Sequence, residues 1–549
     1  IMKRRNFLRI STPAVLGPLV LEKSILKPFA TGSLARIFNC EDVNDRILMI
    51  VQLKGGNDGL NCIVPTNQYD TYKNFRPTIG TSLDQLIPLD NTLSNDDHIS
   101  LHPGLISFKE LYDQGCFTLV QAVGYANSNK SHFKGTDLWL SGGDSTPAHF
   151  NYKSGWMGRY LDASYPGLAG EPTVDHPDPL GIQLGSKQQF LGFHTEHQHE
   201  AGINLSGQDP AGFYSLVSEL GGIAPAHIPT SDYGNNIEYI IDIEHSTSRY
   251  SNRISEVFKK GINMGTYPDY DLADQLKTVA RMISGGGKTK IYVVSIGSFD
   301  THQNQVEGSN PLDGTHGKLL TQLSESILAF QNDLRMMQLD DRVVGVTFSE
   351  FGRRPKENGS KGTDHGTVAP MFLFGTPVRA GIVGKNIDLS QVGSGNDIVG
   401  MGNDYRDVFT ALLQDWLGAS DRVLEDTYFG DYVTTKAPIL ESQYVVSPEC
   451  YIDTYLSSSI FNRPAQLSLY PNPARNVFSF QINPGGQGVA FITLTDTSGR
   501  TIKQWKMNYV NGENNLTFGI TNVEAGIYMV QMTLSESRRR YTGKLVVID

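Results

Sequence analysis

The stretch Ile47-Leu48-Met49-Ile50-Val51-Gln52-Leu53 is an apolar run of strand length, and it breaks into Lys54-Gly55-Gly56-Asn57-Asp58-Gly59. Such a run suits a strand that is buried on both faces of a parallel sheet. The glycines free the backbone to turn sharply, so Asp58 is expected at the carboxyl end of the strand, where open α/β sheets place their ligands. Asn, Asp and Gly are also ordinary turn formers, so a plain turn is the alternative interpretation.

A second strand-like run, residues 117–124, leads into a polar loop that contains Lys130, Ser131 and His132. Because a helix is expected next, Ser131 is predicted at a helix N-terminus, where the dipole and free N–H groups favour an anionic oxygen. A serine there is also an ordinary N-cap. Lys130 and His132 flank Ser131 and favour a role as nucleophile, because a serine hydroxyl needs a base or a metal ion before it can attack.

Two later strand-like runs also end in chemically active side chains. Residues 290–297 lead to Asp300 and His302, and residues 342–348 lead to Glu350. Hard divalent cations favour carboxylate oxygens, and zinc adds imidazole nitrogens, so these side chains are suitable metal ligands. The runs therefore predict further functional groups at the same edge of the sheet.

More potential ligands lie between and after these runs. His316 precedes a long amphipathic helical pattern, residues 319–337, and a glycine-rich loop carries Asp364 and His365. Each pair alone is weak evidence, because a histidine in a loop is usually solvated or bonded to its neighbours. Together with the strand ends, they predict a metal-dependent site.

Six motifs, in chain order, resemble the bacterial family called domain of unknown function 1501. That family is placed in the alkaline phosphatase superfamily, alongside sulfatases and phosphodiesterases. The resemblance spans roughly residues 44–435 and implies an α/β fold, a three-layer sandwich with a mostly parallel central sheet. The motifs are Leu53-Lys54-Gly55-Gly56-Asn57-Asp58-Gly59-Leu60, Ser131-His132-Phe133, Gly155-Trp156-Met157-Gly158-Arg159-Tyr160-Leu161, Phe299-Asp300-Thr301-His302, Ser349-Glu350-Phe351-Gly352-Arg353 and Thr363-Asp364-His365-Gly366.

The resemblance implies a role for each candidate residue. Ser131 is the expected nucleophile, with Lys130, His132 and Arg353 as further catalytic residues. The implied cofactor is a divalent metal, which leaves zinc, calcium, manganese and magnesium open. Its expected ligands are Asp58, Asp300, His302, His316, Glu350, Asp364 and His365.

Two departures from the superfamily pattern bear on the number of metal ions. Glu350-Phe351 stands where an Asp-His pair is usual, so one imidazole is missing unless Asp364 or His316 replaces it. Asp300 and His302 are also closer together in the sequence than the corresponding Asp and His of the superfamily usually are. One ion is therefore as compatible with the sequence as two.

The implied mechanism is nucleophilic. Ser131 would form a covalent ester with a phosphoryl or sulfuryl group, and this ester would then be hydrolysed. Lys130, Arg353 or Arg354 would offset charge on the transferring group. A solvated loop charge is the alternative interpretation of both arginines, and the one we favour for Arg354.

The first residues have the pattern of an export signal, expected over residues 1–40. A basic stretch, Lys3-Arg4-Arg5-Asn6-Phe7-Leu8, precedes a short apolar run, residues 14–21. The paired arginines resemble a twin-arginine signal, which implies that the twin-arginine or general export machinery is a partner. The apolar run is too short for a transmembrane span.

The last part of the chain has a different composition. Residues 436–466 are expected to be a linker, and residues 467–549 hold short alternating strands that predict a β-sandwich. The stretches Tyr470-Pro471-Asn472-Pro473 and Lys544-Leu545-Val546-Val547 resemble the C-terminal sorting domain of the type IX secretion system of Bacteroidetes. The resemblance implies that this machinery is a partner and that the chain reaches the cell surface or is secreted. A carbohydrate-binding or adhesion sandwich is the alternative.

The net charge and the cysteine content of the chain are both compatible with an exported protein. The chain has 549 residues and a net charge of −11, which argues against a nucleic-acid partner. Its four cysteines lack metal-ligand spacing, so disulfides are allowed but not required. Within the expected catalytic domain, residues 41–435, the segment at about 165–262 is expected to be a cap insertion that selects substrate.

Two functions fit these observations. The first is an exported metal-dependent hydrolase of phosphate or sulfate esters, and the second is a non-catalytic surface or secreted protein that keeps the fold as a scaffold. The missing Asp-His pair favours the scaffold. The presence of the other expected groups favours the hydrolase, which is our expectation; these groups are Asp58, Ser131, Asp300, His302 and His365.

Overall fold

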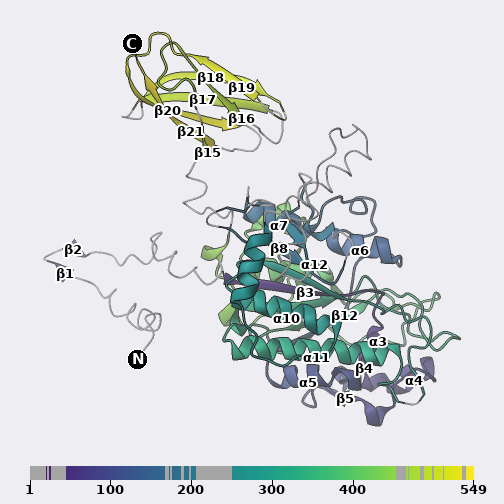
Figure 1. Ribbon diagram of the computed structural model, residues 1–549. Coiled ribbons are helices and arrows are strands. Elements are labelled where there is room, and N and C mark those ends of the chain that lie inside the picture. Colours follow the sequence, from purple (N-terminus) through teal and green to yellow (C-terminus); the bar gives the residue numbers. More distant parts are fainter. Residues whose placement is uncertain are drawn as a thin grey trace. The chain divides into compact units, whose positions relative to one another are not determined.

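A computed structural model of the chain describes residues 20–21, 24–25, 45–166, 168, 172–173, 176–186, 191–196, 200–205, 250–308, 310–452, 465–467, 469–482, 488–496, 500–510, 512, 514–534 and 540–548. The chain divides into two compact units, Ile1–Thr454 and Tyr455–Asp549 (Figure 1). Across the described ranges, no helix has both the length and the apolar character that a membrane span requires.

The larger unit is built on a nine-stranded sheet of order β13-β7-β12-β11-β3-β10-β8-β9, with β14 paired to β7. Neighbouring strands run parallel except at β12, which is antiparallel to β11 and β7. The mostly parallel sheet and its four expected strands are thus confirmed. The strands are β3 (Ile47–Leu53), β7 (Phe117–Gly124), β8 (Gly181–Gln183), β9 (Gly202–Asn204), β10 (Ile291–Ile296), β11 (Val343–Phe348), β12 (Ala369–Phe374), β13 (Gly381–Val383) and β14 (Asn403–Asp404).

Helices cover both faces of this sheet (Figure 1). Every residue of β3 is buried, and alternate residues, from Ile47 to Leu53, pack into one core with α5, α10 and α11. On the other face, Trp139 of α6 stacks on Phe348 of β11 with ring centroids 5.3 Å apart. This is the three-layer sandwich expected from the sequence. The helices named here are α5 (Ile106–Asp113), α6 (His132–Ser141), α10 (Asp271–Ser284) and α11 (Thr315–Met336).

The strand directions bring several loops to one edge of the sheet. β3, β10 and β11 are parallel, so their carboxyl ends meet there. The two antiparallel pairings of β12 give β7 the same direction as β11, while the amino end of β12 lies at this edge. The loops after β3, β7, β10 and β11 therefore converge with the loop before β12, at the edge where α/β sheets place their ligands.

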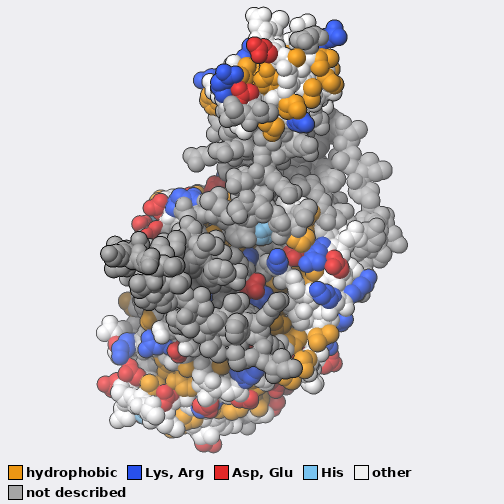
Figure 2. Space-filling model, turned by 90° about the vertical axis from the view of Figure 1, so that its left-hand side faces the viewer, with side chains coloured by type: hydrophobic (Ala, Val, Ile, Leu, Met, Phe, Trp, Pro, Cys, Tyr) orange, Lys and Arg blue, Asp and Glu red, His pale blue; other side chains and the backbone are white. Residues whose placement is uncertain are grey.

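The smaller unit is all-β. A five-stranded sheet of order β15-β21-β20-β17-β18 and the two-stranded sheet β16-β19 enclose one apolar core. Apolar side chains also lie open on the surface of this unit (Figure 2), among them Phe491, Ile527 and Met529. The strands are β15 (Ala465–Gln466), β16 (Val477–Ile482), β17 (Gly488–Asp496), β18 (Thr501–Tyr509), β19 (Asn514–Gly519), β20 (Gly526–Leu534) and β21 (Arg540–Val547).

Some expected features fall outside the described residues. They include the signal at 1–40, apart from the two-residue strands β1 (Val20–Leu21) and β2 (Ser24–Ile25), and residues 206–249 of the expected cap. Two segments assigned to that cap, β8 and β9, belong to the central sheet instead. Cys62 and Cys116 are buried free thiols, whereas Cys450 is disulfide-bonded.

Candidate metal centre

A glycine turn after β3 shapes the edge where the loops converge. Gly55 and Gly56 have φ angles of +120° and +72°, and a Cβ added to Gly55 would lie 2.4 Å from the backbone nitrogen of Asp300. The Gly55 N–H donates to Glu350 Oε1 at 2.9 Å. Glycine alone allows this close approach. The turn thereby joins the loop after β10 to the loop after β11.

His132, Asp300 and His365 form a cluster at this edge. Each offers one ligand atom, and these atoms all lie within 4.8 Å of one another. His132 begins α6, Asp300 follows β10, and His365 precedes β12. Two imidazoles and one carboxylate are a donor set that zinc and other divalent transition metals accept. The side chains that the structure brings together therefore fit a divalent metal ion.

The hydrogen bonds behind the two imidazoles orient them for this purpose. His132 Nδ1 lies 2.7 Å from Glu350 Oε1, and His365 Nδ1 lies 2.8 Å from the backbone oxygen of Lys130. Because both partners accept, each Nδ1 carries a proton, and in the neutral form of each ring the lone pair lies at Nε2. His132 Nε2 is buried, lies 3.4 Å from Asp300 Oδ2 and makes no hydrogen bond. That buried, unused acceptor also fits a metal ligand.

His302 and Asp364 lie at the rim of the cluster. His302 Nε2 is 2.9 Å from His365 Nε2 and 3.2 Å from Asp300 Oδ1. Its Nδ1 is 3.5 Å from Asp364 Oδ1, and both side chains are about half exposed. His302 therefore lies beside the cluster and is open to solvent.

The charges of the cluster suit cation binding. Burial alone would raise the pKa of Asp300, but the hydrogen bond from Arg353 and the charge of its guanidinium lower it to about 2. Asp300 therefore remains anionic at neutral pH. The hydrogen bond to Glu350 raises the pKa of His132, whereas burial lowers the pKa of His365.

Arg353 holds the loops of the site together. Its guanidinium is fully buried and donates to Asp300 Oδ1 at 2.6 Å. Its remaining N–H groups reach the backbone oxygens of Gly55, Gly56, Phe299 and Thr363. Because its guanidinium is buried and donates to Asp300 and to the backbone of three loops, Arg353 positions Asp300.

Lys130 also contributes differently from its expected role. Its ammonium group forms an ion pair with Asp397, while its backbone oxygen accepts the hydrogen bond from His365. The part of Lys130 that serves the cluster is therefore its main chain. Ser131 follows it as the exposed N-cap residue of α6, and its side chain makes no capping hydrogen bond.

Asp58 lies in a separate buried network. Both of its oxygens accept from Arg76, at 2.6 and 2.8 Å, and Gln305 Nε2 donates to Oδ2 at 2.5 Å. His316, the other expected ligand nearby, is buried with Nε2 3.0 Å from Asn57 Oδ1. The structure does not bring Asp58 or His316 into the cluster, and the Arg76 guanidinium pairs with the Asp58 carboxylate where a cation would bind.

Sequence reasoning missed Arg76 and Gln305. Arg76 does not follow a predicted strand, and no spacing rule connects it to an aspartate 18 positions earlier. Gln305 lies in the loop after residues 290–297, but an uncharged amide gave no reason to single it out. It also treated His132 as a catalytic residue and Glu350 as a ligand, whereas the structure places His132 in the cluster and Glu350 behind its ring. The hydrogen-bond pattern that exchanges these roles has no signature in the sequence.

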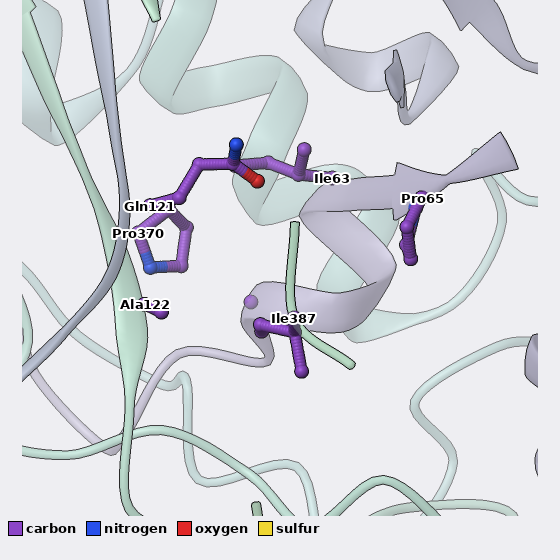
Figure 3. A pocket seen from close by; sticks show the side chains of 7 residues that line it. Ile63, Pro65, Gln121, Ala122, Pro370 and Ile387 are labelled. Carbon is purple, nitrogen blue, oxygen red and sulfur yellow. The ribbon is translucent and has the colours of Figure 1, made fainter. Parts of the chain in front are cut away.

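An apolar recess lies elsewhere at β4 (Ile63–Pro65), β7 and β12 (Figure 3). Ile63, Pro65, Pro370 and Ile387 line it together with Gln121 and Ala122, and none of its lining residues titrates. The recess therefore offers no acid, base or metal ligand, and the cluster of His132, Asp300 and His365 remains the candidate site.

The family comparison agrees with the resemblance seen in the sequence. Residues 257–427, which contain Asp300, His302, Glu350, Arg353 and His365, match a family described as a protein of unknown function (DUF1501). Residues 468–548 match the secretion system C-terminal sorting domain. Both resemblances are thereby confirmed, the DUF1501 segment over a shorter stretch than expected.

Two solved structures are similar to this chain over most of its length. An alkaline phosphatase superfamily protein from Vibrio parahaemolyticus shares 7% identity, with 92% of this chain and 82% of that chain covered and a TM-score of 0.28. A Bacteroides thetaiotaomicron protein connected with glycosaminoglycan metabolism shares 10% identity, with coverages of 91% and 89% and a TM-score of 0.27. These scores are too low to support an argument about function.

The surface component PorZ of the type IX secretion system of Porphyromonas gingivalis shares 20% identity, with a TM-score of 0.12. That match covers 15% of this chain and 11% of PorZ, so it spans about a tenth of the relative. No curated protein matches the chain. The sorting domain itself implies export to the cell surface or secretion.

Proposed function

We propose that this chain is a metal-dependent hydrolase of phosphate or sulfate esters. The observation that carries the proposal is the convergence of His132 Nε2, His365 Nε2 and the Asp300 carboxylate, with each ring held from behind through its Nδ1. A divalent ion bound there would supply Lewis-acid chemistry to an ester oxygen and to an attacking hydroxyl.

Ser131 is the proposed nucleophile. It lies one residue from His132, is exposed, and its hydroxyl makes no capping bond to α6. The first N–H groups of this helix are suited to stabilise negative charge on a transferring group. His302, about half exposed at the rim, can hold a proton at Nδ1 beside Asp364 and is the proposed acid for the leaving group.

The proposed route to the site of action begins with a twin-arginine or general export signal within residues 1–40. The sorting domain match supports the second step, in which the type IX machinery acts on residues 467–549. A hydrolase delivered in this way would meet esters on extracellular polymers.

The test is hydrolysis of 4-nitrophenyl phosphate and 4-nitrophenyl sulfate by purified protein loaded with zinc, manganese, calcium or magnesium. We expect activity with at least one ion, loss with a chelator, and loss in Ser131→Ala. Ser128→Ala is the matched control, because Ser128 lies in the same loop, and it is expected to keep activity. Full activity in Ser131→Ala would remove Ser131 from the mechanism.

The alternative function is a non-catalytic scaffold. The buried Arg76–Asp58 pair favours it, because this pair occupies a carboxylate that the resemblance assigned to metal binding. A folded, metal-loaded protein that hydrolyses neither substrate class would favour the scaffold over the hydrolase.

A further inference from the structure

Three N–H groups already donate to the Asp58 carboxylate. Arg76 Nη2 donates to Oδ1 at 2.8 Å, and Arg76 Nη1 and Gln305 Nε2 donate to Oδ2 at 2.6 and 2.5 Å. Both charged side chains have 0% exposure. A divalent cation placed there would meet a guanidinium at close range in a region with little solvent screening.

The guanidinium is held as firmly as the carboxylate. Arg76 Nε donates to the backbone oxygen of Pro355 at 2.8 Å, and its terminal nitrogens also reach Asn61 Oδ1 and the backbone oxygen of Arg354. Tyr72 in turn donates to Asn61 Oδ1 at 2.8 Å. A bidentate pair with its remaining donors satisfied is a stable arrangement for a buried charge.

His316 lies near the Arg76–Asp58 pair and adds no charge to it. Burial lowers the pKa of His316 to about 4, so its ring is neutral at physiological pH. Its Nε2 is 3.0 Å from Asn57 Oδ1 and 3.9 Å from the buried thiol of Cys62. These contacts hold the buried ring beside the Asp58 network, and His316 is not part of the cluster of His132, Asp300 and His365.

We infer that the described part of the chain offers one site for a divalent ion, at His132, Asp300 and His365, and that the Arg76 guanidinium neutralises Asp58, which the sequence predicted as a metal ligand. The inference rests on the metal dependence of the proposed function. It adds that Asp58 is a structural residue. It also adds that Arg76 ties the turn after β3 to residues 354–355 of the loop that carries Arg353 and His365.

The experiment is a count of bound zinc and manganese per chain by elemental analysis of the full, folded protein after removal of free metal. We expect one ion in the wild type, one ion in Asp58→Asn/Arg76→Gln, and none in His365→Ala. The paired substitution removes both charges but keeps hydrogen-bonding groups, and circular dichroism verifies its fold. Its metal affinity is expected to change by less than the ~10-fold loss typical of a group directly behind a ligand.

The outcomes separate this inference from the proposed function. Two ions in the wild type, or loss of the ion in a folded Asp58→Asn/Arg76→Gln protein, would overturn the inference and leave the hydrolase proposal standing. No bound ion would overturn both. If the double variant does not fold, electron paramagnetic resonance of manganese-loaded wild type decides: an isolated-ion spectrum supports one site, and a spin-coupled pair contradicts it.

Discussion

His132 Nδ1 donates a hydrogen bond of 2.7 Å to Glu350 Oε1, and the Glu350 side chain is only 3% exposed. The same oxygen accepts from the Gly55 N–H at 2.9 Å, so the carboxylate is fixed before it orients the ring. A carboxylate behind a metal-ligating histidine sets its tautomer and raises its basicity. Glu350 is thus a positioning residue for the proposed metal centre.

Replacing Glu350 by glutamine is expected to weaken metal binding by roughly 10- to 100-fold, because the amide keeps an acceptor but removes the charge. Calorimetric titration with zinc measures the change. The matched control is Glu449→Gln at an exposed position, which is expected to bind metal as the wild type does. Equal affinities in the two variants would remove Glu350 from the support of the site.

Asp300→Asn is expected to abolish stoichiometric metal binding while leaving the protein folded, because Asp300 supplies the anionic ligand and is about half exposed. Elemental analysis and a thermal melt provide the two readings. His98→Ala, which changes a histidine outside the cluster, is the control and should retain the ion. A folded Asp300→Asn protein with a full metal complement would contradict the assignment.

Arg353→Met is expected to lower both stability and metal affinity. The substitution leaves Asp300 and several backbone oxygens without their buried donor, and removal of one partner of a buried pair costs about 3–5 kcal/mol. Because Asp300 is partly exposed, we expect the lower end of that range. Urea denaturation measures the loss, and Arg379→Met is the control. A loss below about 1 kcal/mol would argue against this structural role.

The Arg76–Asp58 pair predicts a pH dependence of stability. Burial tends to raise the pKa of Asp58, but the charge and hydrogen bonds of Arg76 outweigh it and lower the pKa. The unfolded value is about 3.9, so the stabilisation is present above about pH 4 and is lost as pH falls through the lower folded value. Melting temperatures below pH 4 should fall less steeply in Asp58→Asn/Arg76→Gln than in the wild type. Parallel curves would contradict the prediction.

Removing residues 467–549 is expected to abolish delivery to the cell surface without affecting metal binding, because these residues lie in a separate compact unit. Cell fractionation and elemental analysis of the purified larger unit check the two halves of this prediction. Surface delivery of the truncated chain would show that sorting does not depend on this region.

The sequence predicted those strands whose complete burial produces a continuous run of apolar residues. β3 and β7 lie inside the sheet and are buried along their whole length, so each reads as a continuous apolar run. Asp300 and His302 were predicted as ligands because they follow such a strand. β8 and β9 have three residues each, too few for a recognisable pattern, and were assigned to a cap instead.

The arrangement of the site was less predictable, because residue type alone does not specify direction. Lys130 was expected to act through its ammonium group, but its backbone oxygen supports His365. Asp58 follows a strand as a ligand would, yet Arg76 reaches it from a position that no strand end marks. Such roles depend on which atoms face each other after folding.

The most direct test of the metal centre is anomalous X-ray diffraction from crystals of the zinc-loaded protein. The account predicts one zinc peak about 2.0–2.2 Å from His132 Nε2, His365 Nε2 and an Asp300 oxygen. A zinc-loaded crystal with no peak between these three side chains would contradict it.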